Sequence, residues 1–525
     1  MAEKIKKIYE TRLKKLHVKI LREPSFKFIK ELLAKFPKGE IYLVGGAVRD
    51  ALLGKGGQKD FDFVVREVAM ENLEKFLEKR GSVVLVGKNF GVFKFMPKSQ
   101  KLEEAIDIAL PRTEHSLGAG GGYRDFKVQS DPAMPIEGDL SRRDFTVNAM
   151  AWNFKNKKLV DPYGGLGDLD KKILRAVGEP EARFKEDYSR MLRGLRFSVQ
   201  LGFKIEDKTR LALKKMMPRI NDLRAGSHDK ERVVPYETVA KEMAKTFWHD
   251  PPKAVELYEE SGALYELMPE IFSMKGCSQP SNFHSEGDVW IHTKMAMANL
   301  VSRNFIKQFG KEKPAAEIVF AVLFHDLGKP LTIKTPERDG TDRIRFDGHD
   351  TAGAQAAEEI CRRLKLDSFP DGSPLKVSPA RVGQMIGKHM LLVQGKIDEM
   401  RPSTIEKYFF NPNFPGLGLL QLTFVDVMAT IPEIGQPDLT NFRQMQGRIN
   451  GLKKLVAKRN RLPPPILDGT EIMKNFKFPP GPKIGELLGV LREAQLSGEL
   501  GGVKKTLREK KRKGLEILNK YLAKK

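Results

Sequence analysis

The chain has 525 residues, which is long enough for about three or four domains with separate cores. Its formal net charge of +24 disfavours an enzyme of small molecules and predicts a polyanionic partner such as nucleic acid. With no signal-peptide pattern, no apolar run of about 18 residues and only two cysteines, the sequence predicts a cytoplasmic protein that crosses no membrane.

The first predicted element is a basic amphipathic helix over residues 1–24, which ends at Pro24. Its charged face could contact an RNA backbone, but a solvated face opposite a docking stripe is the favoured interpretation. A second helix is predicted over residues 25–36.

A glycine turn between a strand and a helix follows. Residues 41–44 form an apolar run typical of a strand, Gly45 and Gly46 interrupt it, and residues 47–53 are predicted to be helical. This order brings backbone N–H groups and the positive end of a helix dipole onto an anion, with Arg49 within reach. The turn therefore predicts a site for a triphosphate.

Two carboxylates come shortly after the turn. Asp60 and Asp62 lie two residues apart in a run typical of a strand, so both side chains are expected on one face of a sheet. Such a pair can hold two divalent cations, one that activates an attacking hydroxyl and one that neutralises phosphates. The alternative, a solvated turn with two surface acids, is disfavoured by the neighbouring glycine turn.

The next segments predict a small mixed sheet with a helix against it. The helix is expected over residues 70–79, and the strands over residues 82–86, 92–95 and 104–110. Asp107 is either a third acid near the metals or, as we favour, an exposed side chain. The glycine-rich segment 112–127 is interpreted as a mobile loop beside the active site, with an ordinary surface loop as the alternative.

Polar side chains precede an apolar run in residues 140–152. Arg143 is expected to contact a triphosphate or to hold Asp144, and Asn148 to form a hydrogen bond with a ribose hydroxyl. A turn-rich hinge is predicted at residues 161–165, after which the sequence becomes almost wholly helical.

A helix predicted to include residues 186–196 carries a possible reader of bases. Asp187 and Arg190 lie one turn apart, a spacing usually found in a surface ion pair. Beside a nucleotide, the carboxylate could accept from the amino group of adenine or cytosine while the guanidinium donates to the adjacent ring nitrogen. Uracil and guanine present the reverse order, which would cost roughly 1–3 kcal/mol for each unpaired group. The buried stripe of this helix is expected to comprise Tyr188, Leu192, Leu195 and Val199.

Five motifs in order resemble those of the class II tRNA nucleotidyltransferases, the CCA-adding enzymes, and of their relatives the bacterial poly(A) polymerases. They are LVGGAVRDALLG with DFDFVV, RRDFTVNAMAW, DPYGGLGDL and EDYSRMLRGLRF, and the resemblance covers residues 41 to about 270. The resemblance implies an α+β, mostly α protein with a polymerase-beta-like nucleotidyltransferase head, followed by a helical neck, body and tail.

The same resemblance implies the roles of individual residues. Asp60 and Asp62 correspond to the catalytic Mg²⁺ ligands. The expected nucleotide contacts are Gly46, Arg49, Arg143, Asp187, Arg190, Arg193 and Arg196. The implied partners are the 3′ acceptor end of tRNA, ATP and CTP.

A second group of chemically informative residues lies after Pro280. The chain has nine histidines, and five of them fall between His284 and His389, including an adjacent His325–Asp326 pair after an apolar helix. Imidazole with carboxylate suits a hard or borderline divalent cation, so a metal site is favoured over buried, hydrogen-bonded histidines.

This region resembles an HD-type metal phosphohydrolase domain, as appended to some CCA-adding enzymes. The resemblance implies hydrolysis of 2′,3′-cyclic phosphates and 2′-nucleotides by a divalent metal of unknown identity. The implied core ligands are His292, His325, Asp326 and Asp426, with His349 and His389 as candidates for a second metal or a substrate phosphate. Asp426 is chosen only from its position in a predicted helix far downstream of the other three ligands.

The C-terminal part is predicted to be a basic helical tail. Gly481 and Pro482 open a helix whose N–H groups could hold a backbone phosphate, and the last helix is strongly basic, which favours RNA docking over a solvated face. The expected domains are an extension (1–24), head (25–160), neck (161–225), body (226–279), HD domain (280–436) and tail (437–525).

The sequence therefore predicts a metal-dependent nucleotidyltransferase that adds CMP and AMP to the 3′ end of tRNA without a template. One alternative is an A-adding enzyme or poly(A) polymerase, since the motifs are shared. Another is an HD phosphohydrolase with a nucleotide-sensing head, and a third is a non-catalytic RNA-binding protein, which the carboxylate pair disfavours.

Overall fold

The computed structural model forms two compact units, Met1–Met268 and Pro269–Lys525. The predicted class, α+β and mostly α, is confirmed. Asp60, one of the two predicted catalytic carboxylates, lies outside the described residues. The described residues are 2–55, 61–86, 91–98, 105–116, 126–224, 231–393, 395–456, 464–501 and 506–524.

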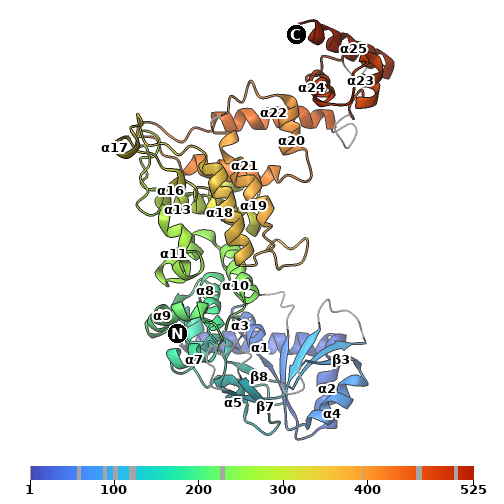
Figure 1. The fold of residues 1–525 in the computed structure, drawn as a ribbon. Coiled ribbons are helices and arrows are strands. Elements are labelled where there is room, and N and C mark those ends of the chain that lie inside the picture. Colours follow the sequence, from blue (N-terminus) through green and yellow to red (C-terminus); the bar gives the residue numbers. More distant parts are fainter. Residues whose placement is uncertain are drawn as a thin grey trace. The chain divides into compact units, whose positions relative to one another are not determined.

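The first unit is built on a mixed sheet of seven strands, which confirms the predicted sheet (Figure 1). The strand order is β3-β4-β5-β2-β1-β8-β9, with β2 parallel to β5 and the other neighbours antiparallel. The strands are β1 (Glu40–Val44), β2 (Asp62–Arg66), β3 (Gly81–Val86), β4 (Val92–Pro97), β5 (Ile106–Ala109), β8 (Ala151–Asn153) and β9 (Leu159–Val160).

Alternating residues of β2 are buried on both faces of this sheet. On one face Phe63 packs edge-on against Phe28 of α2 (Lys27–Lys35), with ring centroids 5.9 Å apart. Helix α4 (Met70–Glu78) packs against strand β3. On the other face Val64 joins a cluster with Leu140 of α5 (Ile136–Ser141). The burial of each such side chain stabilises the folded state by about 1.5–3 kcal/mol. Since Asp62 lies two residues before Val64, it faces the same side as α5.

The N-terminal helix α1 (Ala2–Arg22) docks on this unit as the pattern predicted. Its apolar stripe is buried, and the Arg12 side chain donates a hydrogen bond of 2.5 Å to the Leu52 carbonyl at the end of α3 (Gly46–Leu52). The buried residues of the stripe are Leu13, Leu16 and Ile20. Among the described side chains on its other side, Lys7, Lys14, Lys15 and Lys19 are exposed.

Two sequence expectations were wrong in part. The ends of the glycine-rich segment are not loop: β6 (Arg112–Ser116) pairs with β7 (Phe126–Ser130) in an antiparallel hairpin, because the glycines are confined to the centre. The predicted helix 186–196 is also two helices, α7 (Pro180–Glu186) and α8 (Ser189–Leu201). Asp187 between them is extended, at φ −151°, so it does not share a helix with Arg190. The buried stripe predicted for α8 is confirmed.

The second unit begins with helices that surround the predicted metal site. The helices are α13 (Val289–Asn299), α15 (Ala316–Phe324), α18 (His349–Arg363), α19 (Pro379–Ile386) and α21 (Gly416–Ala429). α15 and α18 come together through a glycine just after α15. A Cβ at Gly328 would lie only 2.0 Å from the His349 carbonyl oxygen, so no larger residue permits this approach.

The C-terminal helices of this unit have a small core of their own. They are α23 (Gly469–Phe476), α24 (Pro482–Leu496) and α25 (Leu507–Ala523), whereas the preceding α22 (Thr440–Val456) packs in a separate cluster through Met445 and Ile449. The core includes Ile472, Leu487, Leu491 and Leu518. Pro482 occupies the first turn of α24, as predicted for a helix that opens after Gly481. None of the helices in the described ranges has both the length and the apolar run that a membrane crossing requires.

Replacing Gly165 with alanine should destabilise the first unit, whereas replacing Gly167 should not. Both lie in α6 (Gly165–Asp170), but a Cβ at Gly165 would be 2.2 Å from the Thr146 carbonyl oxygen, while one at Gly167 would meet no described atom within 4 Å. We expect Gly165→Ala to lower the free energy of unfolding by about 1–3 kcal/mol. Gly167→Ala should leave it unchanged or raise it by up to about 1 kcal/mol. Thermal and urea unfolding measure the difference, and equal effects would contradict the packing argument.

Candidate functional site

The sheet places a carboxylate beside the glycine turn. Asp62 is the exposed first residue of β2, and it is paired with Val44, the last residue of β1, immediately before Gly45. On its other side Asp62 is paired in parallel register with Asp107 of β5, so both carboxylates share one face. Lys94 donates to Asp107 at 2.9 Å. The position of Asp107 supports its interpretation as a third acid of this site.

Arg143 lies against the glycine turn. Gly45 has φ +68°, and a Cβ there would lie 2.8 Å from Arg143 Nη1, so the turn requires glycine. Arg143 Nη2 donates to the fully buried Asp139 at 3.3 Å. Its Nε is buried without a hydrogen-bond partner among the described residues. Arg143 Nη1 lies instead at the start of α3, where the first N–H groups of a helix have no partner within the helix, and a guanidinium in that place fits a bound anion.

A chain of hydrogen bonds connects α3 to α8. Arg49 donates to the side-chain oxygen Oδ1 of Asn148 at 2.6 Å, and the side-chain Nδ2 of Asn148 donates to Asp144 at 3.1 Å. Asp144 also accepts from Arg193 Nε at 2.8 Å. Burial would raise the pKa of Asp144, but the Arg193 guanidinium holds it well below its usual range. Asn148 is thus committed to this chain, and Arg193, rather than Arg143, holds Asp144.

Three of the predicted nucleotide-binding arginines surround one aromatic ring. The guanidinium carbons of Arg49, Arg193 and Arg196 lie 5.3, 5.4 and 4.1 Å from the centroid of Phe197. Arg196 also donates to the buried Glu242 at 2.5 Å. Phe197 was missed at the sequence level, although its position four residues after Arg193 places both on one face of a helix.

Asp187 and Arg190 are positioned by different neighbours. Arg190 Nη1 donates to Glu186 at 2.5 Å, and its Nη2 donates to the Arg142 carbonyl at 3.0 Å. Asp187 Oδ1 accepts from the Ser189 N–H at 2.9 Å. Its Oδ2 accepts no hydrogen bond within the described ranges, so one oxygen of this half-buried carboxylate is available to a ligand.

Four buried histidines converge in the second unit. His292 lies in α13, His325 directly follows α15, His349 begins α18, and His389 lies in the short helix η5 (His389–Leu391). The Nε2 atoms of His292 and His325 are 3.4 Å apart, and those of His349 and His389 are 3.3 Å apart. The structure therefore brings together all four histidines that the sequence pattern selected.

Backbone contacts determine which ring nitrogen carries the proton. In His325, His349 and His389, Nδ1 lies 2.6 to 2.8 Å from the carbonyl oxygen of the residue three positions earlier. A carbonyl only accepts, so each Nδ1 must donate its hydrogen. In its neutral form each ring then presents the lone pair of Nε2 to the centre of the cluster.

Asp426 lies with the first histidine pair. Its Oδ1 is 3.0 Å from His292 Nε2 and 3.6 Å from His325 Nε2. Helix α21 thus brings Asp426, which lies far downstream of the histidines in the sequence, into the cluster.

Asp326 lies between the two pairs. Its Oδ2 is 3.4 Å from His325 Nε2, and its Oδ1 is 3.9 Å from the Nε2 atoms of both His349 and His389. Lys329, one turn later, forms an ion pair with Asp326 at 2.7 Å. Lys329 was not selected from the sequence, although its spacing from the His325–Asp326 pair was visible.

The cluster fits divalent cations. Two lone pairs that face each other at hydrogen-bond distance need a proton or a cation between them. Burial would lower the pKa of His325, but Asp326 and Asp426 raise it to about 10, whereas burial lowers the pKa of His389 to about 4. The possible ligand sets are His292, His325 and Asp426 in one group, and Asp326, His349 and His389 in the other. Imidazole nitrogens together with carboxylate oxygens suit divalent cations of borderline hardness.

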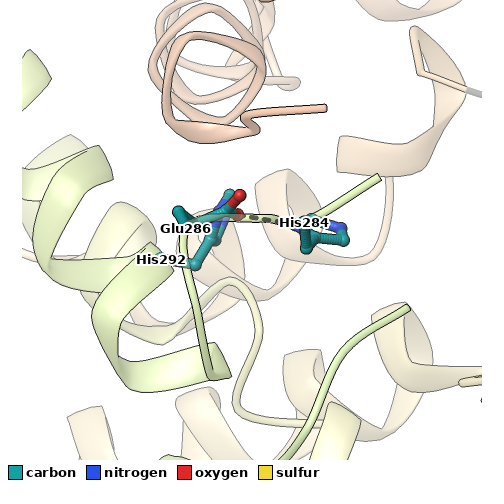
Figure 2. A group of neighbouring side chains, drawn as sticks. All are labelled: His284, Glu286 and His292. Atoms are coloured by element: carbon teal, nitrogen blue, oxygen red, sulfur yellow. Dashed lines mark hydrogen bonds and ion pairs between the residues drawn. The ribbon is translucent and has the colours of Figure 1, made fainter. Parts of the chain in front are cut away.

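A third group lies beside this cluster (Figure 2). Glu286 Oε1 accepts from Nδ1 of His284 at 2.7 Å and from Nδ1 of His292 at 2.8 Å. Burial would raise the pKa of Glu286, but the hydrogen bonds from these two rings lower it to about 2, so the side chain is anionic. Glu286 was missed because a single acid in a loop carries no pattern.

Comparison with known families matches two parts of the chain. Residues 41–175 match a family described as the poly A polymerase head domain, and residues 291–413 match the HD domain. The first match contains the glycine turn and Asp62. The second contains the four clustered histidines and Asp326, while Asp426 lies beyond its end.

Comparison with solved structures gives the fold of the whole chain. The Thermotoga maritima CCA-adding enzyme complexed with tRNA-CCA is 20% identical, with a TM-score of 0.57, and the alignment covers 98% of each chain. The Bacillus stearothermophilus CCA-adding enzyme in complex with CTP is 20% identical, with a TM-score of 0.56, and covers 96% of this chain and 99% of its own. An apo CCA-adding enzyme is 22% identical, with a TM-score of 0.58 and coverage of 97% and 98%.

Asp326→Ala should remove metal from the histidine cluster, because this carboxylate faces both histidine pairs. We expect elemental analysis of the full chain, after exposure to Mn²⁺, Co²⁺ or Zn²⁺ and dialysis, to show at least one equivalent fewer than in the wild type. Asp347→Asn, at an exposed carboxylate two residues from His349, is the matched control and should retain the wild-type content. Equal metal content in all three proteins would contradict the assignment.

Proposed function

This chain belongs to the class II family of CCA-adding enzymes and poly(A) polymerases that carry an HD domain, and we propose that it adds CMP and AMP to the 3′ end of tRNA without a template. The observation that supports this most directly is the position of Asp62 beside the glycine turn and Arg143, at one end of the central strands β1 and β2. The solved structures that share its fold include complexes of CCA-adding enzymes with tRNA, ATP and CTP.

In the proposed reaction the chain positions two reactants. Backbone N–H groups after Gly45 and the guanidinium of Arg143 would receive the triphosphate, while Asp62 and Asp60, with Asp107 nearby, would hold Mg²⁺. When bound, Mg²⁺ would lower the pKa of the 3′ hydroxyl and neutralise phosphate charge. The hydroxyl oxygen forms a bond to the α-phosphorus in line as the bond to the β-phosphate oxygen breaks, and pyrophosphate leaves.

Base selection would be a task of Asp187 and Arg190. The Glu186 carboxylate and the Arg142 carbonyl hold the Arg190 guanidinium in one orientation, and Asp187 retains an oxygen that can accept from an exocyclic amine. Since adenine and cytosine both present this amine next to a ring acceptor, such a pair would admit ATP and CTP and reject GTP and UTP. The Arg49–Arg193 chain would keep α8 in register with the phosphate site.

The histidine cluster favours a second activity, hydrolysis of phosphoesters such as 2′,3′-cyclic phosphates at an RNA end. Its imidazoles present four Nε2 lone pairs toward two carboxylates, as a two-cation site requires. When bound, the cations would supply Lewis acidity and an activated water. The exposed basic residues of α25 and the net charge of +24 would attract the RNA.

Asp62→Ala should abolish nucleotide incorporation by the head. With tRNA lacking its last three nucleotides, Mg²⁺ and each labelled NTP in turn, the wild type should incorporate C and then A, but not U or G. The variant should lose at least roughly 100- to 1,000-fold in rate, because Asp62 would anchor the metals. Glu71→Ala, at an exposed acid in α4, is the control. Incorporation of A alone by the wild type would instead indicate an A-adding enzyme or poly(A) polymerase.

His349→Ala should separate the two activities. We expect it to abolish hydrolysis of a 2′,3′-cyclic phosphate while nucleotide incorporation stays at the wild-type rate, since His349 lies in the second unit. Asp62→Ala should have the opposite effect. A wild type that hydrolyses the cyclic phosphate but incorporates no nucleotide would favour an HD phosphohydrolase with a nucleotide-sensing head.

A further inference from the structure

His292 differs from the other three clustered histidines in the partner of its Nδ1. His325, His349 and His389 each donate to a backbone carbonyl within their own segment. His292 instead donates to Glu286, a carboxylate from the loop that precedes α13. A carboxylate makes the imidazole more basic than a carbonyl does, and therefore makes its Nε2 a stronger metal ligand.

Glu286 is held in place for this contact. Its side chain is only 1% exposed, and its Oε2 accepts from the Ile431 N–H at 3.0 Å. The neighbouring Ser285 N–H donates to the Ile431 carbonyl at 2.7 Å. Ile431 lies two residues after the end of α21, the helix that carries Asp426, so these bonds tie the loop of Glu286 to α21 as well as to α13.

The distances indicate hydrogen bonds rather than a further cation site. Both nitrogens that meet Glu286 in Figure 2 lie 2.7 and 2.8 Å from the same oxygen atom. A cation held by these groups would lie about 2.0–2.1 Å from each nitrogen and would displace both N–H protons. Because the Glu286 carboxylate already satisfies both protons and the Ile431 N–H, no such displacement is needed.

We propose that Glu286 is a positioning residue that orients His292. Through this contact, the position beside His292 and Asp426 would bind its cation more tightly than the position beside His349 and His389. The inference depends on the metal centre proposed above. The two groups of ligands would therefore differ in their affinity for a cation. In the group with Asp426, a carboxylate accepts from Nδ1 of one imidazole, whereas in the group with His349 and His389 only backbone carbonyls do so.

Co²⁺ titration of the metal-free full chain, followed by its visible absorption, tests this proposal. The wild type should bind two equivalents whose affinities differ by about tenfold or more, and Glu286→Gln should weaken the tighter one by about 10- to 100-fold while the other changes by less than about threefold. The absorption band of the tighter equivalent should shift with this variant. His284→Asn, which removes the other imidazole bonded to Glu286, is the control and should leave both affinities within about threefold.

Several outcomes would overturn the proposal. Two wild-type equivalents of equal affinity would do so even if no variant at Glu286 folds, and so would equal weakening of both equivalents by Glu286→Gln. Loss of a third equivalent in both variants would indicate a cation held by His284, Glu286 and His292. Absence of any Co²⁺ binding would instead defeat the metal centre itself, which distinguishes the two failures.

Discussion

An ion pair between the buried Asp144 and the partly exposed Arg193 connects the segment between α5 and β8 to helix α8, and the arrangement of the head site depends on it. The carboxylate is held on its other side by Asn148, which in turn holds Arg49 of α3. Removing Arg193 would leave the buried Asp144 carboxylate without its cation, which costs about 3–5 kcal/mol in a fully buried pair and less here because water screens the partly exposed Arg193. Arg190, which is proposed to read the base, lies one turn before Arg193 in the same helix, so a shift of α8 would disturb both the network at the phosphate site and the base reader.

The histidine cluster follows the same physical rule with different groups. Four imidazoles and two carboxylates are removed from water, and each needs a partner for every donor and acceptor. The Nδ1 protons have partners in carbonyls or in Glu286, which leaves the Nε2 lone pairs and the carboxylate oxygens facing one another. Such an arrangement is balanced by positive charge: Lys329 supplies part of it at Asp326, and bound cations would supply the rest.

Much of the head could be predicted because its elements are short and strongly patterned. The strand before Gly45, the helix after it and the apolar alternation of β2 are local features, and their boundaries agree with the structure to within one or two residues. The break at Asp187 was missed because the apolar stripe continues across it, while the Asp187 carboxylate begins α8 by accepting from Ser189. The hairpin of β6 and β7 was missed because central glycines dominated the composition of a segment whose ends pair as strands.

By itself, the sequence determined the residue types available for chemistry and their local spacing: acids after a glycine turn, arginines along a helix, and histidines gathered in one region. The tertiary structure decided which of them meet. Asp107 lies beside Asp62 only through the parallel pairing of β5 with β2, and Asp426 reaches His292 only through the packing of α21. Glu286 is held against His292 through the N–H of the distant Ile431. Local spacing is governed by backbone geometry, which the sequence displays directly, whereas contacts between distant segments arise from the burial of apolar faces elsewhere in the chain.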